Sequence, residues 1–295
     1  MNMNEIVYRQ PKTEAELTAA LSEMTEKSRI LAGGTDLLIE IRSKRPEIDL
    51  VVSLWGMDEW KEIREEDGWL RIGALATHDQ IDKDERVRTY ARALAMACHS
   101  VGSQQVRNKG TIGGSIGNNS PAGDMMPNIF LLHGEIELLD SEGNCKRIPA
   151  EEYLDASGRA AIQMGEAIKA VWIPICPERD SCFVKLGSRR EVTIAQIDLC
   201  LAWTCAEGEH KDLEMVMGAV DRRPLWIEEA ADLLRPAVIT DEAKDQLAAG
   251  LAARITAIRQ NRKRPPKLKI TEAERLYKER AVKGVLYDVV AAMEQ

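Results

Sequence analysis

The sequence predicts an α+β protein, in which two small lobes of mixed helices and strands precede a domain whose strands come first and whose helices come last. Three observations predict this arrangement. Up to residue 177, short apolar runs typical of strands alternate with segments whose apolar residues recur at helical spacing. Two glycine pairs, Gly33-Gly34 and Gly113-Gly114, interrupt this part of the chain. Beyond Pro177, three strand-like runs precede three helical stretches.

The first lobe is predicted over residues 1–55. A helix is expected from Thr13, a residue type that caps helices, and its apolar pattern continues to Lys27. The remaining elements of this lobe are a strand at Ser28–Ala32, a turn at Gly33-Gly34, a helix that starts at Thr35-Asp36, and a strand at Asp49–Leu54.

The second lobe is predicted over residues 56–177. Its alternating pattern indicates a strand at Trp69–Leu75, and helical spacing indicates a helix at Arg86–Cys98. A further helix is expected at Met125–His133, with Asp124 as its cap and Gly134 as the residue that ends it. Two more strands are expected, at Glu135–Asp140 and Ile168–Ile175.

The segment Pro174–Pro177 breaks the pattern, and we place the domain boundary there, so that the last domain covers residues 178–295. Its expected elements are strands at Cys182–Leu186, Ile197–Thr204 and Leu213–Val220 and helices at Trp226–Leu234, Asp241–Ile258 and Thr271–Met293. The basic segment Arg259–Lys269 fits either a solvated connector or a contact with a partner protein.

Composition excludes several classes of protein. The net charge of −8 argues against nucleic acid, which attracts basic surfaces. No stretch approaches the roughly 18 apolar residues that a membrane helix needs, and no basic-then-apolar leader opens the chain, so a cytoplasmic location is expected. The cysteines and histidines are scattered, which predicts free thiols and no metal site.

The glycine segments are the strongest indication of function. Gly33-Gly34 follows a strand and precedes a helix start, so its backbone N–H groups would suit a phosphate, although a plain strand–turn–helix connection has the same pattern. The segment Thr111–Asp124 adds an acid and several side chains that can bind phosphate or polyol oxygens: Thr111, Ser115, Asn118, Asn119 and Ser120. Neither segment matches a Rossmann or phosphate-loop motif. Together they predict a dinucleotide clamped between the two lobes.

Several blocks of sequence resemble one family. Ala32–Leu38, Gln105–Gly114 and Ser120–Asp124, in this order and spacing, resemble the FAD-binding medium subunit of the molybdenum hydroxylases, as do Tyr8–Thr13, Phe183–Glu191 and Tyr277–Leu286. The resemblance covers essentially the whole chain. It implies a two-lobed FAD-binding domain of the PCMH/VAO type, followed by a C-terminal α+β domain of the carbon monoxide dehydrogenase flavoprotein type.

The resemblance also implies a role in electron transfer. FAD would be bound non-covalently, and no side chain of this chain would act in catalysis because the cofactor carries the chemistry. The molybdenum cofactor and two [2Fe–2S] clusters would belong to a large and a small partner subunit, with NAD⁺ or another molecule as electron acceptor.

The residues that would hold FAD follow from the same resemblance. Arg29–Asp36 and Thr111–Ser115 would wrap the pyrophosphate, Asp124 would hold a ribityl or ribose oxygen, Ile168 would face a ring, Lys185 would bind the carbonyl edge of the isoalloxazine, and Ile194 would lie near the ring face. The full expected set is Arg29, Ile30, Leu31, Ala32, Gly33, Gly34, Thr35, Asp36, Val101, Thr111, Gly113, Gly114, Ser115, Asn118, Ser120, Asp124, Ile168, Lys185 and Ile194.

One departure from the family concerns the residues before Ile194. Many relatives carry an acid there, whereas this chain has Val192-Thr193, which leaves the electron acceptor open. Two other functions are compatible with the fold. A free-standing FAD oxidoreductase would need its own substrate pocket with a positioned acid or base, and a flavin-free scaffold would show no flavin spectrum.

Overall fold

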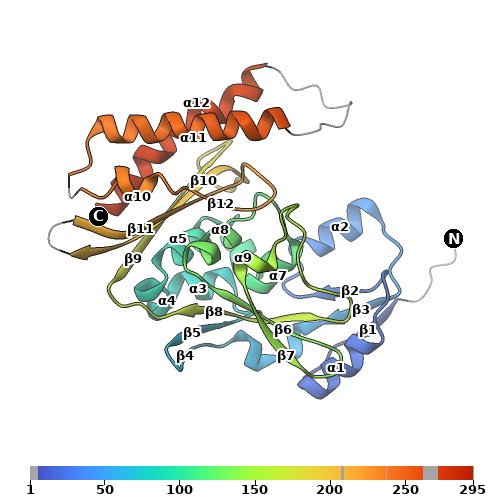
Figure 1. Cartoon of the computed structure of the whole chain (residues 1–295). Helices are drawn as coiled ribbons and strands as arrows, with labels where there is room; N and C mark the ends of the chain where they lie inside the picture. Colours follow the sequence, from blue (N-terminus) through green and yellow to red (C-terminus); the bar gives the residue numbers. More distant parts are fainter. Residues whose placement is uncertain (1–5, 207–208, 237, 262–271, 295) are drawn as a thin grey trace.

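The computed structural model describes residues 6–206, 209–236, 238–261 and 272–294, and it contains three β-sheets (Figure 1). The first sheet has three parallel strands in the order β1-β3-β2. Its strands are β1 (Val7–Arg9), β2 (Arg29–Leu31) and β3 (Leu50–Ser53), with helices α1 (Glu14–Ser22) and α2 (Leu37–Lys44) between them. The order helix, strand, helix, strand that follows β1 agrees with the elements predicted from the sequence.

Helix α1 starts as predicted but ends earlier. The Thr13 hydroxyl accepts a hydrogen bond of 3.2 Å from the Glu16 N–H and so caps the helix. The helix ends at Ser22 rather than continuing to Lys27. Hydroxyl groups cause this difference, because Ser28 accepts from the Thr25 N–H at 2.8 Å and donates to Asp49 at 2.9 Å. These bonds hold residues 25–28 in a turn that leads into β2.

The second sheet has five antiparallel strands in the order β4-β5-β8-β6-β7. Its centre is β8, where the fully buried side chains of Ile72, Val171 and Ile136 lie opposite one another on β5, β8 and β6. The strands are β4 (Ile63–Glu66), β5 (Trp69–Gly73), β6 (Glu135–Leu139), β7 (Cys145–Pro149) and β8 (Ala167–Pro174), after two single 3₁₀ turns at Leu54–Gly56 and Asp58–Lys61.

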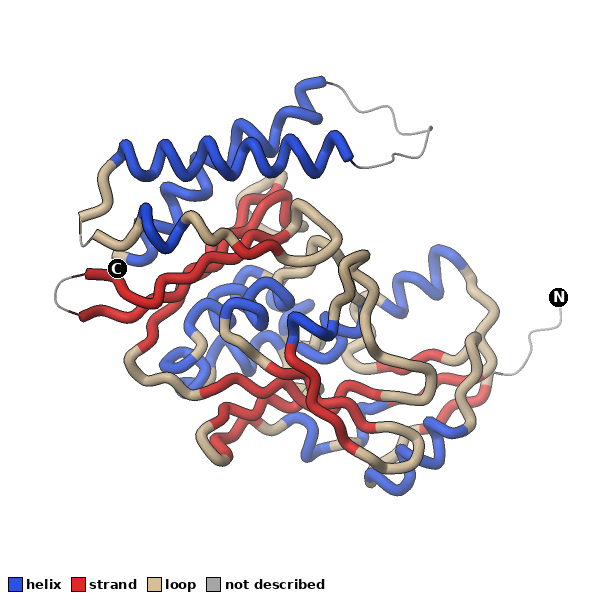
Figure 2. The backbone as a smooth tube through the Cα atoms, in the orientation of Figure 1, coloured by secondary structure: helices blue, strands red, loops and turns tan. Residues whose placement is uncertain are grey.

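Several helices of the second lobe lie between this sheet and the third one, as Figure 2 shows. The predicted helix at Arg86–Cys98 is two helices, because Ala91 leaves the helical conformation at φ −145° and ψ 48°. The helices of this lobe are α3 (His78–Lys83), α4 (Glu85–Tyr90), α5 (Arg92–Ser100), α6 (Gln104–Arg107), α7 (Ile112–Asn118), α8 (Met125–Leu131) and α9 (Ala150–Tyr153).

The two ends of α8 differ from the prediction. Asp124 precedes the helix, but its side chain makes no capping hydrogen bond, since the carboxylate pairs with Lys185 instead. At the other end His133, not Gly134, takes the left-handed conformation, with φ 49°. Gly134 is needed for a different reason: a Cβ there would lie 2.7 Å from Ile173 and 2.8 Å from Ile129.

The third sheet is antiparallel, in the order β12-β11-β10-β9. The helix expected at Trp226–Leu234 is mostly absent, because Leu225–Trp226 pairs with β11 as strand β12 and only Ala230–Leu233 is helical. The basic segment Arg259–Lys269 lies outside the described residues from residue 262 onward. The elements are β9 (Arg179–Gly187), β10 (Ala195–Ala206), β11 (Glu209–Gly218), β12 (Leu225–Trp226), α10 (Ala230–Leu233), α11 (Asp241–Asn261) and α12 (Glu272–Met293).

The third sheet is covered on both faces. Helix α12, with α11 beside it, packs on one face, where alternate residues such as Leu199 and Leu201 are buried, and α5 and α8 pack on the other. Side chains of that second face, Phe183, Cys200, Ala202 and Val216, belong to the core of the N-terminal lobes. The domain boundary at residue 177 stays a prediction; β8 and β9, on either side of it, belong to different sheets.

Candidate functional site

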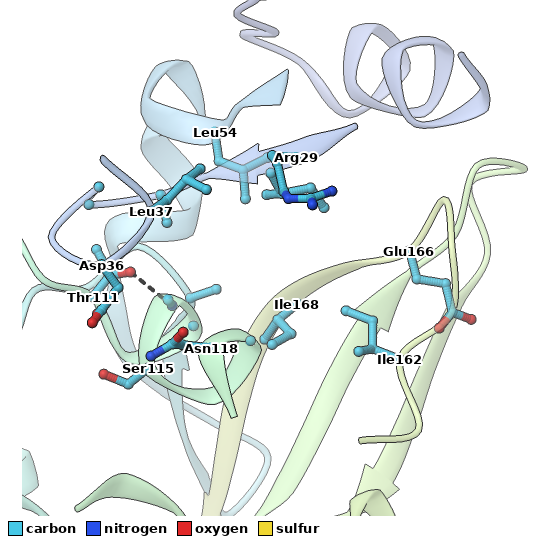
Figure 3. Close-up of a pocket in the computed structure, with 18 of the residues that line it drawn as sticks. Arg29, Asp36, Leu37, Leu54, Thr111, Ser115, Asn118, Ile162, Glu166 and Ile168 are labelled. Carbon is cyan, nitrogen blue, oxygen red and sulfur yellow. Dashed lines mark hydrogen bonds between the residues drawn. The ribbon is translucent and has the colours of Figure 1, made fainter. Parts of the chain in front are cut away.

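A cavity of about 520 Å³ lies where the first lobe meets α7 and β8 of the second lobe (Figure 3). The structure brings both glycine segments to it, although about 80 residues separate them in the sequence. The predicted site residues that line it are Arg29, Ile30, Ala32, Gly33, Gly34, Thr35, Asp36, Thr111, Gly113, Gly114, Ser115, Asn118 and Ile168.

The first glycine segment offers backbone donors. Within the described residues, the N–H groups of Gly33, Gly34, Thr35 and Asp36 have no hydrogen-bond acceptor. Gly34 has φ +74°, which glycine adopts without strain, and this conformation turns the chain from β2 toward α2. Four neighbouring unpaired N–H groups ahead of a helix form a site suited to an anion.

Gly33 fixes how closely the two glycine segments approach. A Cβ on Gly33 would lie 1.9 Å from the backbone oxygen of Lys109, two residues before the second segment begins at Thr111. Such a contact cannot be relieved by a side-chain rotation because the atom it meets is a backbone carbonyl. The missing side chain at this position therefore allows the turn after β2 to lie against the backbone that leads into α7.

About half of the second glycine segment is helical. Residues Ile112–Asn118 form helix α7, capped by the Thr111 hydroxyl, which accepts a hydrogen bond of 3.0 Å from the Gly114 N–H (Figure 3). The Gly113 N–H donates to the Ala74 oxygen at 2.9 Å. These N–H groups are already used, so this segment contributes side chains, chiefly Ser115 and Asn118, rather than backbone donors.

Few positive charges reach the cavity. Arg29 is the one lysine or arginine among the described residues that line it, and its Nη1 donates to the backbone oxygens of Glu26 and Ser28. Glu166 is paired with Lys146 at 2.5 Å and accepts from the Gln163 N–H at 2.8 Å. An anionic ligand would therefore be held by backbone N–H groups and hydroxyls rather than by lysine or arginine side chains.

Apolar side chains also line the cavity, among them Ile30, Leu54, Ile162 and Ile168. Figure 3 shows Ile168 between Asn118 and Ile162, and Ile162 lies near Glu166, away from Asp36 and Thr111. A polar end with hydroxyls and N–H groups next to an apolar wall fits a ligand with a phosphate and a planar ring. This is the combination that a dinucleotide carries.

A second group of predicted residues lies outside this cavity. Lys185, on β9, donates to Asp124 at 2.7 Å and to the Ser100 backbone oxygen at 2.9 Å, next to Val101. Burial raises the pKa of Asp124, while the Lys185 charge opposes that rise. Asp124 Oδ1 is buried and has no donor within the described residues. Leu31, Ser120 and Ile194 also lie outside the cavity lining, and Ile194 is 72% exposed.

Sequence reasoning missed one buried side chain that touches the site. His78 Nε2 lies 3.1 Å from Ser115 Oγ, and His78 Nδ1 lies 3.5 Å from Cys98 Sγ. No spacing in the sequence links these three residues, which come from α3, α7 and α5. Other lining residues that were not predicted include Leu37, Leu54, Ile162, Met164 and Glu166.

Comparison with known proteins gives consistent matches. Residues 2–176 match the family described as the FAD binding domain in molybdopterin dehydrogenase. The nicotinate dehydrogenase FAD-subunit of Eubacterium barkeri is 31% identical over 82% of this chain and 84% of that protein. The carbon monoxide dehydrogenase medium chain of Afipia carboxidovorans is 28% identical over 85% of this chain and 86% of that protein.

Solved structures match the fold over almost the whole chain. The reconstituted CO dehydrogenase from Oligotropha carboxidovorans contains a chain with a TM-score of 0.81 and 25% identity, covering 99% of this chain and 98% of that one. Quinoline 2-oxidoreductase from Pseudomonas putida matches with the same TM-score at 24% identity. Within the described residues, no helix has the length and apolarity that a membrane span requires.

Proposed function

The chain belongs to the family of FAD-binding domains of molybdopterin dehydrogenases, and on this premise we propose that it is the electron-transfer subunit of a molybdenum-containing hydroxylase, with FAD held between its two N-terminal lobes. The observation that carries the proposal is the cavity in which four unpaired backbone N–H groups of one glycine segment share a space with the hydroxyl and amide groups of the other. Bound FAD would supply the electron-accepting and electron-donating chemistry.

We assign the pyrophosphate to the polar end of this cavity. The N–H groups of Gly33–Asp36 would donate to its oxygens, and Ser115 and Asn118 would contact it from α7. The apolar wall formed by Leu54, Ile162 and Ile168 would cover the adenine. These contacts need no covalent link, so FAD should leave the protein without proteolysis.

The flavin end is assigned to Val101, Asp124 and Lys185. The support is the buried ion pair of Lys185 and Asp124, beside the half-buried Val101, and Asp124 Oδ1, which can still accept a hydrogen bond from a ligand hydroxyl or N–H. A lysine at this place would stabilise negative charge on a ring carbonyl edge. Ile194, exposed at 72%, would be covered by the flavin or by a partner subunit.

We further propose that the electrons come from [2Fe–2S] clusters on a small partner subunit, which receives them from a large molybdenum subunit, and leave to NAD⁺ or another acceptor. The support comes from the names of two relatives. One is called an FAD-subunit and the other a medium chain, and both names describe one part of a larger assembly. A cytoplasmic location belongs to the same proposal, and the six free cysteines support a reducing compartment.

The first test is the flavin content and affinity of the purified chain. We expect FAD at close to one per chain, released by mild acid, with ADP competing because it carries the pyrophosphate and adenine that the cavity is assigned. FMN, which lacks that half, should bind more weakly. A chain that takes up no FAD either alone or when produced with its neighbours in the complex would overturn the proposal.

The second test concerns the partners. The chain should copurify with subunits that contain molybdenum and iron–sulfur clusters, and substrate added to that complex should bleach the flavin absorbance. Bleaching by a small substrate in the absence of any other chain would instead indicate a free-standing oxidoreductase. NAD⁺ that restores the absorbance would identify the acceptor.

A further inference from the structure

A buried histidine connects the cavity to the interior of the second lobe. His78 is the first residue of α3 and is only 1% exposed. The capping box of Thr77 and Gln80 fixes this helix end, and the His78 backbone N–H donates to the Gly110 oxygen at 3.0 Å. The imidazole is therefore held in one place, with Ser115 on one side and Cys98 on the other.

The environment keeps this imidazole neutral. Burial, together with the positive charges of Arg107 and Lys185, lowers the pKa of His78 to about 4. A neutral imidazole carries one proton, so one ring nitrogen donates and the other accepts. The two neighbours of the ring decide which nitrogen holds the proton.

Cys98 decides the tautomer. Burial raises the pKa of the Cys98 thiol well above its ordinary value, so the thiol keeps its proton. That proton can be directed at His78 Nδ1, 3.5 Å away, or at Met125 Sδ, 3.6 Å away. An imidazole nitrogen is a much stronger acceptor than a thioether sulfur, and from this we infer that the thiol donates to Nδ1 rather than to Met125. The ring proton is then on Nε2, which faces Ser115.

The Nε2–H group occupies a lone pair of the Ser115 hydroxyl. His78 is the sole hydrogen-bond partner of Ser115 Oγ within the described part of the chain, and Ser115 lines the cavity. Because the oxygen already accepts from the ring, its own O–H stays available to donate to another acceptor, such as a ligand in the cavity that Ser115 lines. The opposite tautomer would draw the O–H toward the ring and turn lone pairs toward the ligand.

We propose that His78 is a positioning residue, which holds the Ser115 hydroxyl as a hydrogen-bond donor to a phosphoryl oxygen of the bound dinucleotide. The proposal rests on the assignment of the pyrophosphate to this cavity. It gives the site a directed neutral donor next to the N–H groups of Gly33–Asp36, in a cavity that has little positive charge. The order of donation runs from Cys98 to His78 to Ser115 to the ligand.

The first experiment needs no ligand, and it uses a substitution only to assign signals. Nitrogen-15 NMR of the full chain, with label only in histidine, reports the protonation of each ring nitrogen, and His78→Gln assigns its signals among the four histidines. We expect a proton on Nε2 and none on Nδ1 at pH 7. A proton on Nδ1, or on both nitrogens, would overturn the proposal even if the chain binds FAD.

The second experiment is a double-mutant cycle on FAD affinity, using His78→Leu, Ser115→Ala and the double variant. A hydrogen bond to a charged phosphoryl oxygen predicts that Ser115→Ala weakens FAD binding by about 10-fold to 100-fold. His78→Leu should weaken it by a similar factor in the wild-type background and by less than about twofold when Ser115 is already Ala.

Equal effects of His78→Leu in both backgrounds would show a purely structural role and would overturn the proposal. Should His78→Leu fail to fold, His78→Gln, which keeps a donor at the end of its side chain, replaces it: binding should then stay within a few-fold of wild type. Absence of any FAD binding by wild type would overturn the proposed function and the ligand contact of Ser115 with it, whereas the NMR result tests the His78 tautomer independently of any ligand.

Discussion

Lys185 Nζ lies 2.7 Å from Asp124 Oδ2, and this ion pair is almost completely buried, with side-chain exposures of 6% and 9%. The pair joins β9 of the third sheet to the start of α8 in the second lobe. Removing one partner of a buried pair leaves an uncompensated charge, which costs more than the pair contributes. The bond therefore makes the proposed flavin end and the docking of the C-terminal domain depend on the same two side chains.

We predict that Lys185→Met lowers the free energy of unfolding by about 3–5 kcal/mol, because Asp124 would be left buried without its cation. The double variant Lys185→Met with Asp124→Leu should recover most of the loss. Urea unfolding at pH 7 measures both. The matched control is Lys44→Met, whose ion pair with Glu40 is exposed and should matter by less than about 1 kcal/mol. A Lys185→Met variant as stable as this control would contradict the prediction.

Gly33→Ala should separate the two glycine segments. Its Cβ would meet the Lys109 backbone oxygen at 1.9 Å, so the backbone must move, at a cost of about 1–3 kcal/mol typical of overpacking. FAD affinity should fall by more than about tenfold. Gly250→Ala is the control, since nothing lies within 4 Å of that Cβ in α11, and it should stabilise the chain by about 0.5–1 kcal/mol. Flavin titration measures the FAD affinity of both variants, and urea unfolding measures their stability. A Gly33→Ala variant that behaves like Gly250→Ala would contradict the prediction.

Much of the fold could be predicted because local patterns carried the information. The apolar strands at Asp49–Leu54 and Ile168–Ile175 agree closely with β3 and β8, and Thr13 caps α1 as expected. Where the prediction failed, distant residues decided the outcome. Asp124 does not cap α8 because its carboxylate forms an ion pair with Lys185, which is distant in the sequence. Leu225–Trp226 is a strand because it pairs with β11.

In the candidate site too, local sequence patterns predicted some features, whereas contacts between distant residues determine others. The glycine pairs predicted that two distant segments would share one ligand, and the cavity brings them together. The sequence could not show that Ile112–Asn118 forms a helix whose first N–H groups are bonded to Ala74 and Thr111. The role of His78 could not be predicted from the sequence, because its contacts with Ser115 and Cys98 form only when three helices pack against one another.

The domain boundary at residue 177 can be tested by truncation. Phe183, Cys200, Ala202 and Val216 of the third sheet complete the core of the N-terminal lobes. A fragment of residues 1–177 would expose the apolar surface that these side chains cover, so we expect it to aggregate or to lack a cooperative unfolding transition. Circular dichroism with heating measures this. A fragment that unfolds cooperatively and binds FAD would show that the two lobes form an independent domain.

Asp198 gives the stability of the chain a specific pH dependence. Its carboxyl is completely buried on β10, opposite Lys185 on β9 and Gly218 on β11. Burial, and then the negative charge of Asp124, raise the pKa of Asp198 well above its ordinary value of 3.8. The folded chain therefore keeps a proton that the unfolded chain releases, so the free energy of unfolding should fall as the pH rises above about 4.

Asp198→Asn, which replaces the protonated acid by a neutral group of the same shape, should remove this fall. The variant should be more stable than wild type at pH 8, and the difference should shrink toward pH 5, with a slope of no more than about 1.4 kcal/mol per pH unit. Urea unfolding at several pH values compares the two chains, and other titrating groups cancel because both chains contain them. A stability difference that is the same at pH 5 and pH 8 would mean that Asp198 does not change its protonation on folding.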